Sequence, residues 1–219
     1  MKKSTKILFA VSAGLLALFT LFTVLVKTVD VAAVGPLGSS VGFSGLNKSV
    51  FDALGTSELW YDLTELAGLL ALASACGFAA VGLYQLIKRK SLAKVHKTIW
   101  ALAGFYAVVL ACYVLFEIVV INERPVLIEG VLEASYPSSH TILVSSFLGG
   151  AIVAFHRLVK KLPARICFDA AAGAIIAVTA VGRLLSGVHW LTDILAALLL
   201  SATLVTFYSA VEGWLVEKE

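Results

Sequence analysis

Long apolar runs separated by short polar or glycine-rich segments dominate this chain of 219 residues. A run of about 20 apolar residues is long enough to cross a bilayer as an α-helix. The pattern therefore predicts an all-α protein, a bundle of six transmembrane helices that forms a single domain over residues 1–219, with no internal repeat. The predicted helices span residues 7–26, 66–87, 98–121, 138–158, 166–185 and 190–211.

The first apolar run follows three lysines, as the core of a secretory signal peptide does. Its twenty residues, 7–26, exceed the usual length of such a core and match a full membrane span. We therefore interpret this run as the first transmembrane helix. Cleavage near Ala32-Ala33 is the alternative.

The composition also indicates a membrane protein with several spans. Hydrophobic residues make up 60% of the chain and charged residues 14%, whereas soluble domains are nearer a quarter charged. The net charge of +3 is too small to indicate nucleic-acid binding. Cys76, Cys112 and Cys167 fall within apolar runs, and we interpret them as small buried hydrophobic residues rather than disulfide partners or metal ligands.

The segments between the apolar runs differ in character. Residues 30–58 are rich in Gly and Ser, and they contain a short amphipathic stretch, 46–54, that we expect to lie on the membrane surface. Residues 88–97 and 157–165 are strongly basic, whereas residues 122–137 form a polar connection.

The positive residues predict how the chain is oriented in the membrane. The N-terminus, the two basic segments and the tail hold thirteen of the seventeen Lys and Arg. Positive residues mark the cytoplasmic side. We therefore predict that both termini lie in the cytoplasm. The segments around 30–60, 122–138 and 183–190 then lie on the extracytoplasmic side of the cell membrane.

Residues 182–193, Gly-Arg-Leu-Leu-Ser-Gly-Val-His-Trp-Leu-Thr-Asp, place three polar groups between the last two apolar runs. His189 and Asp193 are four residues apart, so on a helix they share a face, where a carboxylate can orient an imidazole and stabilise its charge. Arg183 offers a fixed positive fork to an anion. The alternative is a plain helix end with an interfacial His, an Arg and a capping Asp.

The predicted topology brings further polar residues to the same outer face. They are Arg124, and Ser138, Ser139 and His140 at the start of the fourth helix. Arginines recognise phosphate through paired hydrogen bonds, and the free N–H groups of a helix N-terminus bind anions. One histidine can attack phosphorus while the other protonates a leaving oxygen. These residues indicate phosphate-ester chemistry at the membrane surface.

The order of these residues resembles the three signature motifs of the type 2 phosphatidic acid phosphatase superfamily, K-x6-R-P, P-S-G-H and S-R-x5-H-x3-D. The corresponding segments are Arg124-Pro125, Pro137-Ser138-Ser139-His140 and Arg183-x5-His189-x3-Asp193. The resemblance covers residues 117–193, and six-helix members of the family match the whole layout. It implies a membrane lipid phosphatase of the undecaprenyl-diphosphatase-like branch that needs no metal or other cofactor.

The same resemblance implies a role for each residue. His189 is the nucleophile that forms a phosphohistidine, and Asp193 orients it and balances its charge. His140 protonates the departing oxygen and then activates water. The groups implied to hold the phosphoryl oxygens are Arg124, Arg183, Ser138 and the backbone N–H near Ser139. Two arginines suit this chemistry because phosphoryl transfer depends on positioning and charge stabilisation.

Three positions depart from the family's pattern. Ser139 stands in place of the Gly of the second motif, and Gly182 in place of the Ser of the third. Glu117 stands where the first motif has Lys, seven residues before Arg124. If the third helix continues, Glu117 lies two turns from Arg124 and either pairs with it or stays protonated in the membrane. We expect Glu117 to modify substrate specificity.

The predicted outer-face location favours undecaprenyl diphosphate as the substrate, with phosphatidylglycerophosphate and phosphatidate as alternatives. Two other classes are a catalytically degenerate lipid-binding or transport protein and an intramembrane serine hydrolase that uses Ser139 or Ser186. Neither serine lies in a nucleophile-elbow pattern. The expected partners are a lipid phosphate and the bilayer, without nucleic acid, and the sequence carries no indication of oligomeric state.

Overall fold

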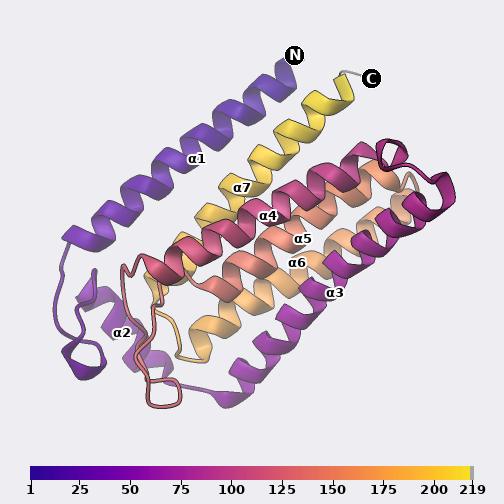
Figure 1. Ribbon diagram of the computed structural model, residues 1–219. Helices are drawn as coiled ribbons and strands as arrows, with labels where there is room; N and C mark the ends of the chain where they lie inside the picture. The colour runs from indigo at the N-terminus through magenta and orange to yellow at the C-terminus, as the bar shows by residue number, and fades with distance from the viewer. Residues whose placement is uncertain (218–219) are drawn as a thin grey trace.

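The structure, a computed structural model, describes residues 1–217 as an all-α chain. Six of its helices are long and apolar enough to cross a membrane, and they lie side by side with both chain ends at one end of the bundle (Figure 1). The predicted six-helix architecture is confirmed. The long helices are α1 Lys3–Thr28, α3 Glu58–Arg89, α4 Lys97–Ile118, α5 Ser139–Leu158, α6 Leu162–Leu185 and α7 Leu191–Glu217.

Helix α3 begins at Glu58 rather than at the predicted residue 66. Ser57 occupies the N-cap position, and Glu58 lies in the first turn, where a negative charge faces the positive end of the helix dipole. Asp62 and Glu65, the acidic residues that interrupt the apolar pattern, therefore lie on the helix. This extension carries α3 to the end of the bundle at which the candidate residues gather.

Helix α4 ends at Ile118 rather than at the predicted residue 121. The next residue, Val119, has a non-helical backbone with φ −94 and ψ 87, in line with the weak helix propensity of a run of β-branched residues. The helix therefore does not continue toward Arg124. The predicted helical relation between Glu117 and Arg124 is wrong for this reason.

Helix α5 lies at the centre of the bundle, where it contacts α3, α4, α6 and α7. Its small residues allow this close packing. A Cβ atom added to Gly150 would lie 2.5 Å from Cε1 of Phe105 on α4, and one added to Gly149 would lie 2.7 Å from Cγ2 of Val205 on α7. Close backbone approach of this kind is how membrane helices gain van der Waals contact.

The cysteines do not lie where the sequence predicted. Cys76 and Cys167 are exposed on the outside of the bundle, and Cys112 is partly buried, so the prediction of three buried cysteines is wrong. In a bilayer an apolar side chain gains little from moving inside the protein, because lipid tails are as apolar as the core. An apolar run therefore does not tell which of its residues face the protein interior.

The loops that join α1 to α3, α4 to α5 and α6 to α7 gather at the end of the bundle opposite the chain termini (Figure 1). The predicted amphipathic stretch forms helix α2, Ser44–Leu54. Its Asn47 is fully buried. The Asn47 side chain donates to the Gly42 carbonyl at 2.8 Å and to Thr192 Oγ1 at 2.9 Å, and it accepts from the Thr192 N–H at 3.2 Å. Asn47 thus ties α2 to the start of α7.

Candidate active site

The turn between α6 and α7 carries the residues of the third motif. Arg183 lies in the last turn of α6 and is 1% exposed, and α7 begins only at Leu191. His189 therefore precedes the helix instead of lying on it. Gly187 has φ +72, and a Cβ atom there would lie 2.7 Å from the Gly55 carbonyl oxygen. Because glycine alone fits such a position without strain, the turn can press against the segment that leads into α3.

The two ring nitrogens of buried His189 have different surroundings. Nδ1 lies 3.1 Å from the carbonyl oxygen of Ser135. A carbonyl oxygen can only accept, so Nδ1 carries the proton. Nε2 is buried and has no hydrogen-bond partner within residues 1–217. The neutral ring therefore keeps a free lone pair on Nε2, and a free lone pair is what a nucleophilic nitrogen requires.

Burial lowers the pKa of His189 well below the ordinary value for histidine, and the positive charges of Arg183 and Arg124 lower it further. Desolvation and like charge both disfavour the imidazolium. The neutral form of the ring is therefore the stable one at neutral pH. Two arginines that attract an anion thus also keep the neighbouring histidine unprotonated.

Asp193 is fully buried near the start of α7 and lies between two groups. Its Oδ2 accepts a hydrogen bond from the backbone N–H of Trp190 at 2.9 Å, as the third residue of a helix does in a capping box. The same oxygen lies 3.6 Å from Nδ1 of His189, which is close enough for charge interaction but beyond hydrogen-bond distance. The structure thus contains the capping relation and a charge relation to His189, whereas the ring is oriented by the Ser135 carbonyl and not by this carboxylate.

The residues of the second motif begin α5. Ser138 is the buried N-cap, and its Oγ accepts from the Thr141 N–H at 3.4 Å and lies 3.0 Å from Thr141 Oγ1. Its backbone N–H donates to the carbonyl oxygen of Asp193 at 3.1 Å. Ser138 therefore joins the start of α5 to the start of α7. Ser139 lines a small cavity that Glu117 also lines.

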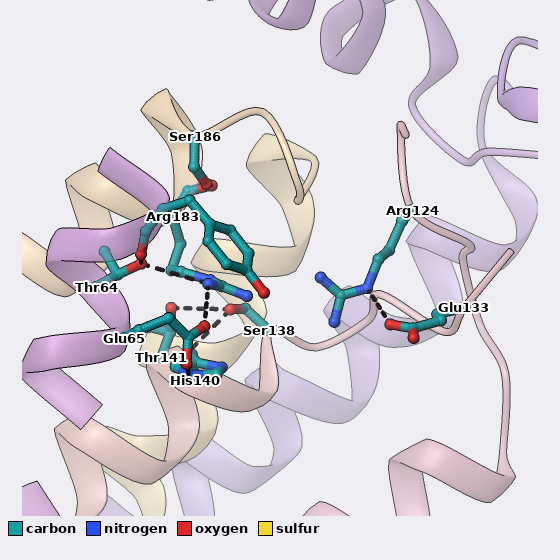
Figure 2. A network of polar contacts seen from close by, with 10 residues as sticks. Thr64, Glu65, Arg124, Glu133, Ser138, His140, Thr141, Arg183 and Ser186 are labelled. Carbon is teal, nitrogen blue, oxygen red and sulfur yellow. Dashed lines mark hydrogen bonds and ion pairs between the residues drawn. The ribbon is translucent and has the colours of Figure 1, made fainter. Parts of the chain in front are cut away.

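Glu65 on α3, which sequence reasoning missed, links two of the candidate residues. Its Oε1 lies 3.2 Å from Nη1 of Arg183, and its Oε2 lies 3.1 Å from Nε2 of His140 (Figure 2). The available signal was an acidic residue directly before the predicted span 66–87, because an ionisable group at a membrane helix is costly unless it serves a site.

The same stretch of α3 holds Arg183 by two further contacts. Nη1 of Arg183 donates to Thr64 Oγ1 at 3.3 Å, and its guanidinium carbon lies 5.1 Å from the ring centroid of Tyr61. A guanidinium over an aromatic face is a favourable cation–π arrangement. The early start of α3 therefore fixes the position of a buried cation.

Arg124 lies apart from these residues, and its guanidinium points toward Ser138 (Figure 2). Arg124 lies in the loop between α4 and α5, where its backbone N–H donates to the backbone carbonyl of Glu133 at 3.0 Å. Its side-chain Nε forms a 3.1 Å ion pair with the Glu133 carboxylate. Of the two predicted fates of Glu117, pairing with Arg124 is therefore wrong. The shorter α4 leaves Glu117 exposed in its last turn.

An apolar groove of about 640 Å³ leads away from His140 and Glu65 between α3, α4 and α5. Its lining includes three exposed leucines, Leu69, Leu72 and Leu110. The groove therefore opens on the side of the bundle that faces lipid, and its polar end is at the candidate site.

The positive charge of the site comes from Arg124 and Arg183. In the part of the chain that the structure describes, no group of three or more His, Cys, Asp or Glu side chains is placed to hold a metal ion.

The sequence model of the PAP2 superfamily, the type 2 phosphatidic acid phosphatases, matches residues 69–216. The chain belongs to the PAP2 superfamily. This confirms the resemblance on which the site was predicted. The matched range contains all three motif segments and begins after Glu65, so this carboxylate lies outside the part of the chain that the PAP2 model describes.

A solved structure shares the fold of this PAP2 protein. It is the crystal structure of a transmembrane PAP2-type phosphatidylglycerolphosphate phosphatase from Bacillus subtilis, which matches with a TM-score of 0.61 and 18% sequence identity over 95% of this chain and 97% of that chain. Among curated proteins, no sequence matches. The protein is an integral membrane protein with the fold of PAP2-type lipid phosphatases.

Proposed function

We propose that this protein is a membrane lipid phosphatase that works through a phosphohistidine on His189. The observation that carries the proposal is the buried imidazole, with Nδ1 bound to the Ser135 carbonyl and Nε2 without a partner within residues 1–217. The charges of Arg183 and Arg124 act on the same ring. A nucleophile beside two cations is the arrangement that phosphoryl transfer needs.

In the first step, Nε2 of His189 attacks phosphorus. A P–N bond forms while the P–O bond to the rest of the lipid breaks, and the electron pair stays on the departing oxygen. That oxygen takes a proton from His140. Arg183 and Arg124 stabilise the charge on the three non-bridging oxygens. Asp193, 3.6 Å from Nδ1, offsets the positive charge of the phosphorylated ring.

In the second step, water attacks the phosphohistidine. His140, neutral after the first step, takes a proton from that water, so the same residue acts as acid and then as base. The P–N bond breaks, its electron pair returns to Nε2, and inorganic phosphate leaves. This sequence uses groups of the chain alone, and we propose that it needs no metal ion.

The proposed substrate is a lipid phosphate or diphosphate whose tail stays in the bilayer. The apolar groove of about 640 Å³ that starts at His140 supports this, because it offers a lipid tail an apolar path beside the phosphate site. Undecaprenyl diphosphate is the first candidate, given the predicted location at the outer face. Phosphatidylglycerophosphate is the second, supported by what the Bacillus subtilis relative acts on.

The test is phosphate release by the purified protein from undecaprenyl diphosphate, phosphatidylglycerophosphate and phosphatidate, with EDTA present. We expect release that withstands EDTA and falls by about a thousandfold or more in His189→Ala, as removal of a covalent nucleophile does. A folded parent that binds these lipids but releases no phosphate would favour the non-catalytic, lipid-binding alternative instead.

A second variant tests the proposed effect of Glu117 on specificity. Glu117→Lys restores the charge of the family's first motif near the cavity that Ser139 lines. We expect it to improve kcat/KM for the diphosphate over the monophosphates by up to about fivefold, the usual size of an exposed charge effect. The matched control, Glu129→Lys, makes the same charge change at an exposed position of the loop that follows α4. An equal change in both variants would remove any special role for Glu117.

A further inference from the structure

We propose that Glu65 is the positioning residue for the proton donor, and that it holds the His140 ring in the orientation in which it protonates the departing oxygen. This inference rests on the proposed phosphatase function. It concerns a residue that lies before the segment matched by the PAP2 superfamily, residues 69–216. The argument depends on the contacts of Glu65, the packing of His140 and the charges around both.

The Glu65 carboxylate is fixed at both oxygens. Oε1 binds Nη1 of Arg183 at 3.2 Å, and Oε2 binds Nε2 of His140 at 3.1 Å. Arg183 is itself held rigidly, because it is 1% exposed and donates to Thr64 Oγ1. A carboxylate anchored to an immobile guanidinium offers His140 an acceptor at a fixed place.

The His140 ring also packs against α3 itself. A Cβ atom added to Gly68 would lie 3.5 Å from Cδ2 and 3.6 Å from Nε2 of the ring. Gly68 lies one turn beyond Glu65 on the same face of α3. The Nε2–Cδ2 edge of the imidazole therefore faces both the Glu65 carboxylate and the helix at Gly68, so two positions of α3 constrain the orientation of a residue that belongs to α5.

The charges explain why the proton donor needs this partner. The proposed reaction requires the imidazolium form of His140, and the positive charges of Arg183 and Arg124 oppose that form. The Glu65 carboxylate, in direct contact with the ring, supplies the opposite charge that offsets this repulsion. With Nε2–H bound to Glu65, the proton that can be transferred is on Nδ1. A carboxylate that holds one nitrogen while the other transfers a proton is the relation between Asp and His in catalytic triads.

A competing interpretation gives the same contacts another meaning. The carboxylate would occupy the phosphate position and leave when substrate arrives, in which case its removal would favour substrate binding. The two interpretations differ in their dependence on the leaving group. An alkoxide cannot depart without a proton, whereas a nitrophenolate can, so a residue that serves proton transfer matters for the first and not for the second.

The experiment compares Glu65→Gln with the parent on two substrates with the same alkyl tail, an alkyl phosphate and a nitrophenyl phosphate. We expect the rate of phosphoenzyme formation to fall by about a hundredfold for the alkyl phosphate, within the range of general acid catalysis, and by less than about threefold for the nitrophenyl phosphate. Glu65→Asp keeps the charge and should recover part of the lost rate. Asp62→Asn, an exposed change on the same helix, should alter neither rate.

A double-mutant cycle with His140→Ala separates a positioning role from a structural one. If Glu65 acts through His140, then Glu65→Gln in the His140→Ala background costs no further rate. Equal losses for both substrates, a gain for both, or additive losses in the cycle would overturn the role of Glu65 while the phosphatase proposal stands. A folded parent that is inactive on both substrates would overturn the phosphatase proposal itself, and with it this one.

Discussion

At the scale of single residues, the chemistry of His189 is set before any substrate binds. The Ser135 carbonyl fixes which nitrogen carries the proton, and burial together with two arginines keeps the ring neutral. A group that must attack phosphorus at neutral pH needs both conditions, the correct tautomer and the unprotonated state. The groups around the ring provide both conditions, although no carboxylate forms a hydrogen bond with it.

The protonation state of His189 can be measured directly. An ordinary histidine takes up its proton near pH 6.5. Burial and the two arginines lower the pKa of His189. We therefore expect the nitrogen NMR signals of its ring to remain those of the neutral Nδ1–H tautomer as the pH is lowered from about 8 to below about 6.5. The signal is identified by its loss in His189→Ala. A midpoint at or above about pH 6.5 would contradict the prediction.

The same shift has a consequence for stability. Below about pH 6.5 the unfolded chain binds a proton at this histidine that the folded protein does not. The folded state therefore loses stability as the pH falls, and it keeps the full contribution of the neutral ring above that range. This direction is opposite to that of a histidine that gains an acidic partner on folding.

The spacing of residues in the sequence was enough to identify much of the candidate site. It could not identify contacts between residues that lie far apart in the chain. His189 and Asp193 were identified together because four residues separate them. Glu65 lies 75 residues from His140 and 118 from Arg183, so no local pattern joins it to them. The exposure of the Glu117 side chain could likewise not be predicted from the sequence, because that exposure depends on the residue at which α4 ends.

At the scale of helices, α3 is the element on which the candidate site depends most. Apolar runs predicted its membrane-spanning part, because about 20 apolar residues are a strong signal. The polar first turns of α3 carry no such signal, since Asp62 and Glu65 resemble loop residues when only hydropathy is considered. Those turns are the ones that hold Arg183 and His140, so the boundary that hydropathy placed least well is the one that matters for function.

A matched pair of glycines tests the packing of α5. A Cβ atom at Gly150 would lie 2.5 Å from Phe105, whereas one at Gly173 on α6 would meet no atom of residues 1–217 within 4 Å beyond its chain neighbours and the backbone of its own helix. We expect Gly150→Ala to lower the unfolding free energy by about 1–3 kcal/mol through overpacking. Gly173→Ala should raise it by up to about 1 kcal/mol, because alanine favours the helix. Thermal unfolding in detergent measures both, and equal effects would contradict the central position of α5.

At the scale of the whole molecule, the candidate site and the chain ends lie at opposite ends of the bundle. Both termini lie at one end (Figure 1), where the Lys2 N–H donates to the Glu217 carboxylate at 2.6 Å. The basic segments 88–97 and 157–165 were predicted for the cytoplasmic side together with these ends. The geometry requires that the loops around the site face the other side of the membrane from them.

Cysteine labelling determines which side that is. In a background without Cys76, Cys112 and Cys167, Glu129→Cys introduces a thiol in the connection between α4 and α5, at the end of the bundle that holds the site. Lys160→Cys introduces one between α5 and α6, at the opposite end (Figure 1). Both positions are exposed. We expect a membrane-impermeant maleimide to label the first variant in intact cells and the second only after lysis. The reverse pattern would place the site in the cytoplasm and exclude substrates of the outer leaflet.

The groove between α3, α4 and α5 opens sideways among exposed leucines rather than toward water. A substrate that enters by this opening arrives by diffusion within the plane of the membrane. The quantity that saturates such an enzyme is the mole fraction of substrate among the surrounding lipids, not its concentration in the bulk solution. Inert lipid added to the vesicles therefore competes for the opening and slows turnover, whereas diluting the same vesicles with buffer leaves each enzyme's supply of substrate unchanged.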